Sequence, residues 1–192
     1  MTLQTLTAER VYSMLGNAPL WKTALDCHEL LASAHVPHAV MGGVAVCLHG
    51  YQRNTVDLDL LVRKVDAEQI KSCLTQAGYQ WDEANHEFMT PQGIPIQFLY
   101  AGERAGTGSE AFLPDPSNAS ALTEREGLPI LSLARLIETK LACGEGNLRR
   151  THKDFADVVE LIAINQLGRS FARYLHKSLR KTYRELAERA KG

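Results

Sequence analysis

Apolar and polar positions near the start of the chain change from helical to strand spacing. Leucines between residues 20 and 34 lie at roughly helical spacing and predict a helix that ends before Pro37. The apolar run 38–41 then stops at Gly42 and Gly43. A short apolar run that is bounded by glycines is typical of a buried strand.

A second strand is predicted a short distance further on. Residues 44–49 fit one or two helical turns closed by Gly50, and residues 55–62 alternate acidic and apolar side chains. This alternation predicts a strand with one special face. We expect Asp66 to cap a second amphipathic helix that runs through Leu74.

The rest of the chain predicts a strand pair and then helices. Residues 87–90 and 94–100 flank a Pro-Gln-Gly turn and predict an antiparallel pair, whereas residues 101–127 are rich in Gly, Pro, Ser and Asn and are expected to be mostly irregular. Helices are then predicted at about 132–143, 151–164 and 170–190. This order predicts an α+β fold, in which helices pack on a small mixed β-sheet and a C-terminal helical part follows.

The same order predicts a division of the chain into two regions. We expect an α/β core over residues 1–127 and a C-terminal helical region over residues 128–192 that packs on the core.

Composition narrows the class of protein. With 45% hydrophobic and 22% charged residues among 192, the chain is too apolar for a disordered polymer. No apolar stretch approaches the ~20 residues that cross a bilayer, and the N-terminus lacks the order of a secretory signal. We therefore expect a cytoplasmic protein without a membrane partner. The four cysteines are scattered, without a C-x-x-C pair, and are interpreted as core residues.

Charge is distributed unevenly along the chain. Residues 169–192 carry a formal charge of +6, and residues 1–168 carry −7. A basic end of this kind contacts a polyanion such as nucleic acid, or it is simply a solvated helix face. The solvated face is the interpretation we favour.

Candidate chemistry is concentrated between residues 41 and 62. Asp57 and Asp59 are two positions apart on the predicted strand, so both carboxylates point to the same side. Two like charges held this close require a cation or a proton between them. Mg²⁺ is suited to one or two carboxylates together with phosphate oxygens of a substrate. The pair therefore predicts a magnesium site, although an exposed strand face is the alternative.

Gly42 and Gly43 support a phosphate site near this pair. Two glycines at a strand-to-helix turn let backbone N–H groups approach a phosphate, and an ordinary tight turn is the alternative. Arg53 and Thr55 precede the acidic strand, where they reach a phosphate or shape the loop. The chain contains neither a P-loop nor a G-x-G-x-x-G motif.

These motifs together resemble the polymerase-beta-like nucleotidyltransferase superfamily. Gly-Gly at a strand end, Arg-x-Thr and then Asp-Leu-Asp-Leu-Leu-Val resemble its core motif, and residues 131–162 resemble its helical half. The similarity is greatest to small prokaryotic members, the minimal and the abortive-infection toxin nucleotidyltransferases. It implies an enzyme that transfers a nucleoside monophosphate from an NTP to an acceptor hydroxyl and releases pyrophosphate.

The resemblance also implies roles for individual residues. Gly42 and Gly43 would hold the triphosphate, Asp57 and Asp59 would ligate Mg²⁺ (or Mn²⁺), and Lys140 would neutralise phosphate charge. Such charge neutralisation is what phosphoryl-type transfer needs most.

Further candidates for nucleotide binding come from the helical half and from the loop. Lys153 and Asp154 would orient the nucleotide or each other, with Asp157 one turn further on, and Arg53 and Thr55 belong to the same nucleotide-binding set. A charge cluster at a helix start is the alternative for the first three.

One position departs from the superfamily pattern. Many relatives supply a third carboxylate from a later strand, but here that position holds Gln97. Either one metal ion suffices, or Glu103 replaces the missing carboxylate, or catalysis is lost.

The acceptor and the partners stay open at this point. The acceptor is tRNA, a protein or a small molecule such as an aminoglycoside, and an antitoxin or a second copy of the chain is a candidate partner. Two alternatives to the enzyme are a catalytically inactive relative that binds a nucleotide, nucleic acid or protein, and a nucleic-acid-binding module that uses the basic end.

Overall fold

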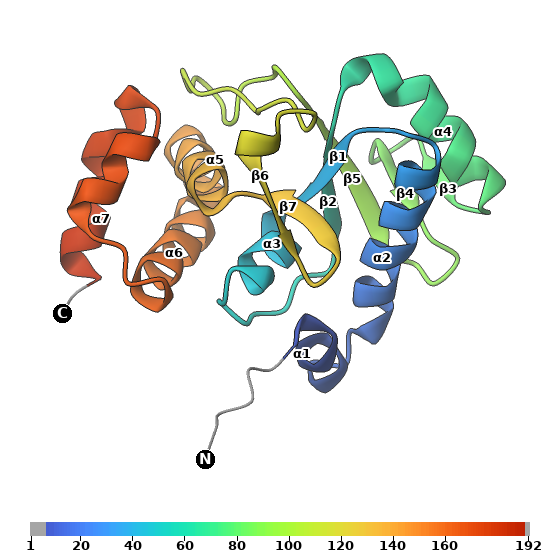
Figure 1. Ribbon diagram of the computed structural model, residues 1–192, viewed down its shortest axis with the longest axis horizontal. Helices are drawn as coiled ribbons and strands as arrows, with labels where there is room; N and C mark the ends of the chain where they lie inside the picture. Colours follow the sequence, from blue (N-terminus) through green and yellow to red (C-terminus); the bar gives the residue numbers. More distant parts are fainter. Residues whose placement is uncertain (1–6, 191–192) are drawn as a thin grey trace.

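The computed structural model describes residues 7–190, which form a seven-stranded sheet with helices around it (Figure 1). The strand order across the sheet is β3-β4-β5-β2-β1-β7-β6. The strands are β1 (His38–Met41), β2 (Leu58–Val62), β3 (Gln80–Asp82), β4 (Glu87–Met89), β5 (Pro95–Tyr100), β6 (Leu122–Arg125) and β7 (Leu128–Leu131).

Helices lie before, between and after these strands. The α-helices are α1 (Ala8–Met14), α2 (Ala18–Ser33), α3 (Gly42–Leu48), α4 (Ala67–Gln76), α5 (Leu133–Gly146), α6 (Leu148–Ile164) and α7 (Arg180–Arg189). Short 3₁₀ helices are η1 (Lys64–Asp66), η2 (Ala119–Ala121), η3 (Arg169–Tyr174) and η4 (Lys177–Leu179).

Strands β1, β2 and β5 at the centre of the sheet fix the register of the acidic strand. β2 pairs antiparallel with β1, where Met41 faces Asp59, and parallel with β5, where Asp59 faces Gln97. Because residues in register point to the same face, Asp59 and Gln97 share a face. The other strand pairs are also of both kinds, so the predicted mixed sheet and α+β fold are confirmed.

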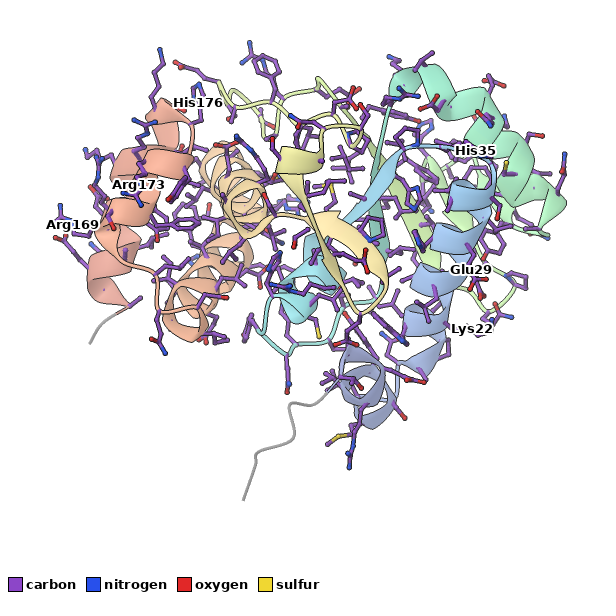
Figure 2. The ribbon with its side chains drawn as sticks, in the orientation of Figure 1. Lys22, Glu29, His35, Arg169, Arg173 and His176 are labelled. Carbon is purple, nitrogen blue, oxygen red and sulfur yellow. The ribbon has the colours of Figure 1, made fainter. Side chains whose placement is uncertain are left out.

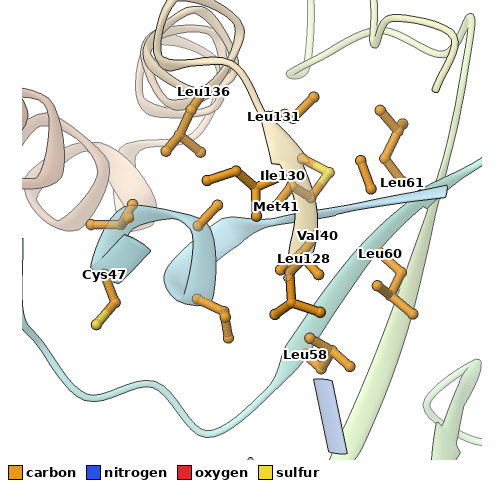
Figure 3. Packing of buried hydrophobic residues seen from close by; sticks show 14 of the residues in the cluster. Val40, Met41, Cys47, Leu58, Leu60, Leu61, Leu128, Ile130, Leu131 and Leu136 are labelled. Carbon is orange, nitrogen blue, oxygen red and sulfur yellow. The ribbon is translucent and has the colours of Figure 1, made fainter. Parts of the chain in front are cut away.

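The core lies between the central strands and the helices. Figure 3 shows side chains of β1, β2 and β7 together at the centre of this core, which also includes Cys47 of α3 and Leu136 of α5. β1 is buried along its whole length, as the apolar run predicts, and Leu58, Leu60 and Leu61 of β2 are fully buried. Burying a leucine of this kind stabilises a fold by roughly 1.5–3 kcal/mol, so these residues hold the acidic strand firmly.

The C-terminal helices gather at one side of the sheet. Figure 1 shows α5, α6 and α7 together, with α2 and α4 on the opposite side of the molecule. α5 packs extensively against α6, and α5 also contacts β7 and α3. Within residues 7–190, no helix is both long and apolar enough to cross a bilayer.

Several elements differ from the sequence-based expectation. Helix α1 and strands β3, β6 and β7 were not predicted, and β7 lies beyond residue 127 yet belongs to the sheet. α6 begins at Leu148, capped by Asn147, rather than at residue 151 or 152. The division into regions at residue 127 stays a prediction.

Two further differences have clear local causes. Asp66 does not cap α4 through its side chain, because its carboxylate accepts hydrogen bonds from Arg63 instead. The helix predicted over 170–190 is interrupted at Leu175, whose backbone is extended. The next backbone N–H, of His176, donates to the Glu138 carboxylate of α5, and this tertiary contact outweighs local helix propensity.

Candidate active site

Asp59 lies directly against the glycine turn that ends β1. Gly42 has a φ of 62°, and a Cβ placed on it would lie 1.7 Å from Oδ2 of Asp59. Only glycine leaves this space free, and only glycine adopts this left-handed backbone without strain. The first glycine is therefore required by the close approach of the acidic side chain.

Thr55 lies next to Gly43 and connects this glycine to Asp57. A Cβ on Gly43 would lie 2.6 Å from Oγ1 of Thr55, and that hydroxyl donates a hydrogen bond of 2.6 Å to Oδ1 of Asp57. The loop that carries these residues is held from α2, because Asn17 Nδ2 donates to the Thr55 carbonyl at 2.6 Å. The two predicted glycines, Thr55 and the two aspartates thus converge on one spot.

The electrostatics of this spot favour a bound cation. Burial and the neighbouring charge of Asp57 raise the pKa of Asp59 to about 6, although Lys140, Arg150 and Lys153 act in the opposite direction. None of the ion pairs found within residues 7–190 involves Asp57 or Asp59. The pair is therefore not neutralised by a fixed cation of the chain.

Divalent magnesium fits this donor set only together with a substrate. Within the described residues, no group of three or more His, Cys, Asp or Glu side chains could hold a metal ion. Asp57 and Asp59 alone supply carboxylate oxygens, and Mg²⁺ is commonly bound by one or two carboxylates together with phosphate oxygens. The two aspartates are thus suited to a metal ion that arrives with a nucleotide.

Lys140 lies in a buried charge cluster between α5 and α6. Its Nζ is 2.9 Å from Oδ1 of Asp154 and 2.9 Å from Oδ2 of Asp157, and the residue is only 5% exposed. Arg53 binds both oxygens of Asp157, at 2.6 and 2.9 Å. The predicted Lys140, Asp154 and Arg53 are therefore brought together, and their contacts are with one another.

Asp157 joins the loop before β2 to α6. Burial by itself would raise the pKa of Asp157, but hydrogen bonds from Arg53 and Lys140 and their charges hold it below its usual value. The bidentate arrangement with Arg53 is the strong form of such a pair. Through it, α6 holds the loop that presents Thr55 and Asp57.

Lys153 and Arg150 complete the positive charge around the aspartates. Lys153 is exposed on α6, and Arg150 Nε donates to Oδ2 of Asp154 at 3.1 Å. Sequence reasoning did not select Arg150. The predicted helix began at residue 151 or 152, so Arg150 lay just outside it, and its spacing of four residues from Asp154 became meaningful only when α6 was seen to begin at Leu148.

Gln97 stands where the third carboxylate was expected, and its side chain is exposed beside Asp59. Its Nε2 donates to Oε2 of Glu87 on β4 at 3.1 Å. Glu103 is exposed beyond the other end of β5. Glu87, which sequence reasoning missed, is therefore the carboxylate that the fold places near Gln97.

A large groove lies elsewhere and contains none of the predicted site residues. It has a volume of about 1120 Å³ and is lined mainly by α2, with Ala77, Tyr79, Pro91 and Gln92. Figure 2 shows Lys22 and Glu29, two of its lining residues, along α2. The active-site candidates are separate from this groove.

Several solved structures share the fold of this chain. The antibiotic-resistance factor ANT(2'')-Ia in solution matches with a TM-score of 0.51 at 11% identity, over 90% of this chain and 93% of that one. The same factor with adenylyl-2''-tobramycin matches with a TM-score of 0.50 at 14% identity, over 83% and 93%. A candidate nucleotidyltransferase from Thermotoga maritima matches with a TM-score of 0.50 at 16% identity, over 82% and 99%.

The fold is that of the polymerase-beta-like nucleotidyltransferase superfamily, so the predicted superfamily is confirmed. The family model described as aminoglycoside-2''-adenylyltransferase matches residues 24–120, just over half of the chain, and the chain belongs to this family. It is a nucleotidyltransferase, an enzyme that transfers a nucleoside monophosphate, as the resemblance implied. No curated protein sequence matches the chain.

Proposed function

We propose that this enzyme transfers AMP from Mg²⁺-bound ATP to a hydroxyl group of a small, cationic, polyhydroxylated acceptor of the aminoglycoside class. The observation that carries the proposal is that Asp59 lies against Gly42 and Asp57 binds Thr55 beside it, while no ion pair found within residues 7–190 involves either aspartate. The positive charges of Lys140, Arg150 and Lys153 act on Asp59. Paired carboxylates next to positive charge suit a metal-bound triphosphate.

In the transfer, the acceptor oxygen forms a bond to the α-phosphorus. The bond from that phosphorus to the bridging oxygen of pyrophosphate breaks, pyrophosphate leaves, and the hydroxyl proton passes to solvent. Mg²⁺ supplies charge neutralisation for the developing pyrophosphate when it is bound.

Residues of the chain would position the reactants for this step. Asp57 and Asp59 would hold the metal ion, and Thr55 keeps the Asp57 carboxylate oriented through its 2.6 Å hydrogen bond. Lys153 is exposed and is available to phosphate oxygens, whereas Lys140 and Arg53 would act mainly through Asp154 and Asp157. Gly42 and Gly43 make room for Asp59 and Thr55, and their backbone N–H groups at the start of α3 would be available to the triphosphate.

The family supports the acceptor and the nucleotide. Its model is described as an aminoglycoside-2''-adenylyltransferase, and one structure of similar fold was solved with adenylyl-2''-tobramycin. Both point to adenylyl transfer and to an amino sugar as acceptor.

A transfer assay tests the proposal. Incubation with α-phosphate-labelled ATP, Mg²⁺ and tobramycin is expected to give a labelled product and pyrophosphate, with GTP, CTP and UTP compared in parallel. Asp57→Asn and Asp59→Asn should each lower transfer by about 10³-fold or more without unfolding the protein, because each removes a metal-binding charge. Failure of all four nucleotides to bind in the presence of Mg²⁺ would refute the proposal.

A polyanionic acceptor is the second candidate. Basic side chains on η3, η4 and α7 are exposed, and Figure 2 shows Arg169 and Arg173 at the outer edge of this helical part. This surface favours an enzyme of the toxin-like kind that modifies tRNA, with an antitoxin as partner. Label that appears on tRNA rather than on tobramycin, at rates that fall steeply with salt, would favour this candidate.

Gln97 favours a third candidate, a catalytically inactive member that keeps the fold and binds a nucleotide, nucleic acid or protein. Wild-type transfer that disappears in Asp57→Asn would dismiss it.

A further inference from the structure

Asp59, Gln97 and Glu87 form a row across three neighbouring strands. Asp59 of β2 faces Gln97 of β5 in the parallel pair, and Gln97 binds Glu87 of β4. Adjacent strands lie ~4.8 Å apart, so the row extends roughly 10 Å from the aspartate toward the edge of the sheet.

Glu87 fixes the orientation of the Gln97 amide. An ionised carboxylate only accepts hydrogen bonds, so the amide nitrogen of Gln97 must face Glu87 and its carbonyl oxygen must face away. The bond is charge-assisted, which makes it stronger than a bond between neutral groups. The free carbonyl oxygen of an exposed side chain is therefore presented on the face that carries Asp59.

The surroundings of Glu87 show that this bond is its main stabilising contact. Glu87 is only 8% exposed, and no ion pair found within residues 7–190 involves it. A buried carboxylate without a cationic partner is unfavourable unless another group compensates it. The hydrogen bond from the Gln97 amide offsets the cost of burying the Glu87 carboxylate. A cationic ligand bound along the row would stabilise this carboxylate further.

On the basis of the proposed function, we infer that the Gln97 carbonyl oxygen binds the acceptor and that Glu87 is its positioning residue. The oxygen would accept a hydrogen bond from a hydroxyl or ammonium group of the acceptor, next to the metal-binding aspartates. The amide keeps this contact neutral beside Asp57 and Asp59, where a third carboxylate would increase repulsion. The Glu87 charge, one strand further out, favours an acceptor that carries amino groups.

The decisive variant is Glu87→Gln. Two facing amides no longer specify which end of Gln97 points outward, so its carbonyl oxygen is lost from the acceptor side in part of the molecules. We expect the Kd and the KM for tobramycin to rise about two- to threefold, because about half of the molecules keep the Gln97 carbonyl oxygen outward and the Glu87 charge is also lost. The KM for ATP should be unchanged, and kcat should change less than twofold.

Two further variants separate positioning from simple support of the β4–β5 pair. The exchange variant E87Q/Q97E keeps the hydrogen bond with its direction reversed and an oxygen acceptor facing outward. It should recover part of the tobramycin binding lost in Glu87→Gln, and the rest stays lost to the added repulsion beside Asp57 and Asp59. Glu83→Gln is the matched control, because Glu83 lies in the turn between β3 and β4 and is exposed. It removes the same charge and should leave tobramycin binding unchanged.

Calorimetric titration of tobramycin, with Mg²⁺ and a non-hydrolysable ATP analogue present, measures binding separately from transfer. Weaker binding in Glu87→Gln, at an unchanged melting temperature, supports the inference, and it does so even if the wild type transfers nothing and the proposed function fails. Unchanged binding in Glu87→Gln overturns the inference, while wild-type transfer keeps the proposed function. A wild type that binds no tobramycin overturns the inference as well.

Discussion

At the level of single residues, Asp59 shows how the surroundings set the chemistry of one carboxyl group. Burial and the charge of Asp57 raise its pKa, and Lys140, Arg150 and Lys153 reduce that rise. The ionised form is therefore unfavourable in the folded protein without a metal ion. A site of this kind binds a cation well because the cation relieves an existing repulsion.

Asp59→Asn should therefore stabilise the metal-free protein. The folded-state pKa of about 6 lies above the unfolded value, so the stability linked to this group is full below the unfolded pKa and is lost as pH rises through 6. At pH 7.5 the substitution should raise the free energy of unfolding by up to about 3 kcal/mol, from 1.36 kcal/mol per pKa unit. Urea unfolding at pH 7.5 and pH 5 measures this difference, which should shrink at pH 5.

Ligand binding should stabilise the wild type more than the Asp59→Asn variant, which reverses the difference expected without metal. Mg²⁺ with a non-hydrolysable ATP analogue should raise the melting temperature of the wild type and should have little effect on Asp59→Asn. A variant that is less stable than the wild type without metal would contradict the assigned cost of this charge.

At the level of elements, the sequence predicts how the acidic strand and the glycine turn meet but not how the helices hold them. The D-x-D spacing and the Gly-Gly pair were sufficient for β1, α3 and β2. The register that places Glu87 opposite Gln97 could also be predicted from the sequence. The turn at 91–93 pairs residue 90 with 94, and counting outward along an antiparallel pair then places 87 opposite 97. Gln97 was considered without the residue that faces it on the neighbouring strand, and Glu87 was therefore missed.

Other elements were beyond local reasoning. β7 contains Pro129, which weakens a strand signal, and it exists because β1 and β6 flank it. The contact between Asp157 and Arg53 spans 104 positions of the chain, so no local spacing predicts it. Such contacts are set by tertiary packing, which a single sequence does not display.

The cluster that joins α6 to the loop should be important for stability. Asp157→Asn leaves Arg53 and Lys140 with one fewer carboxylate in a buried setting. Removing one partner of a buried pair typically lowers the free energy of unfolding by about 3–5 kcal/mol. Chemical denaturation measures the free energy of unfolding of Asp157→Asn and of the control variant Asp26→Asn. The control breaks the exposed pair with Lys22 and should change this free energy by no more than about 1 kcal/mol. Equal effects of the two variants would show that the cluster adds nothing beyond a surface pair.

At the level of the whole molecule, the order of elements predicted the architecture because each signal was local and strong. The helix, strand and glycine signals between residues 20 and 62 gave the centre of the sheet in the right order. The basic end was predicted as a single helix, because nothing between 170 and 190 resembles a stop signal. The structure interrupts it where His176 binds Glu138, a contact that only the assembled molecule contains.

The stability of the whole molecule should respond to pH through the buried histidines His38 and His49, whose pKa values burial lowers, and through Asp59, which acts in the opposite sense. His38 begins the buried strand β1, its Nε2 is 2.9 Å from Nδ1 of His28, and burial lowers its pKa. As pH falls below the usual histidine pKa, His38 is protonated in the unfolded chain but stays neutral in the folded protein. The free energy of unfolding therefore falls. Asp59 acts in the opposite sense over the same range, because its folded form takes up a proton first. The wild type should therefore show a shallow pH dependence between pH 7.5 and pH 5.5.

His38→Gln should separate the contribution of His38 to the pH dependence of stability from the opposite contribution of Asp59. Whatever its stability at pH 7.5, the variant loses the destabilising histidine contribution, so its free energy of unfolding relative to the wild type should increase as the pH falls to 5.5. His152→Gln is the control, because His152 is exposed on α6. Urea unfolding at several pH values gives the slope of each difference. Parallel curves for wild type and His38→Gln would mean that this buried histidine does not link protonation to folding.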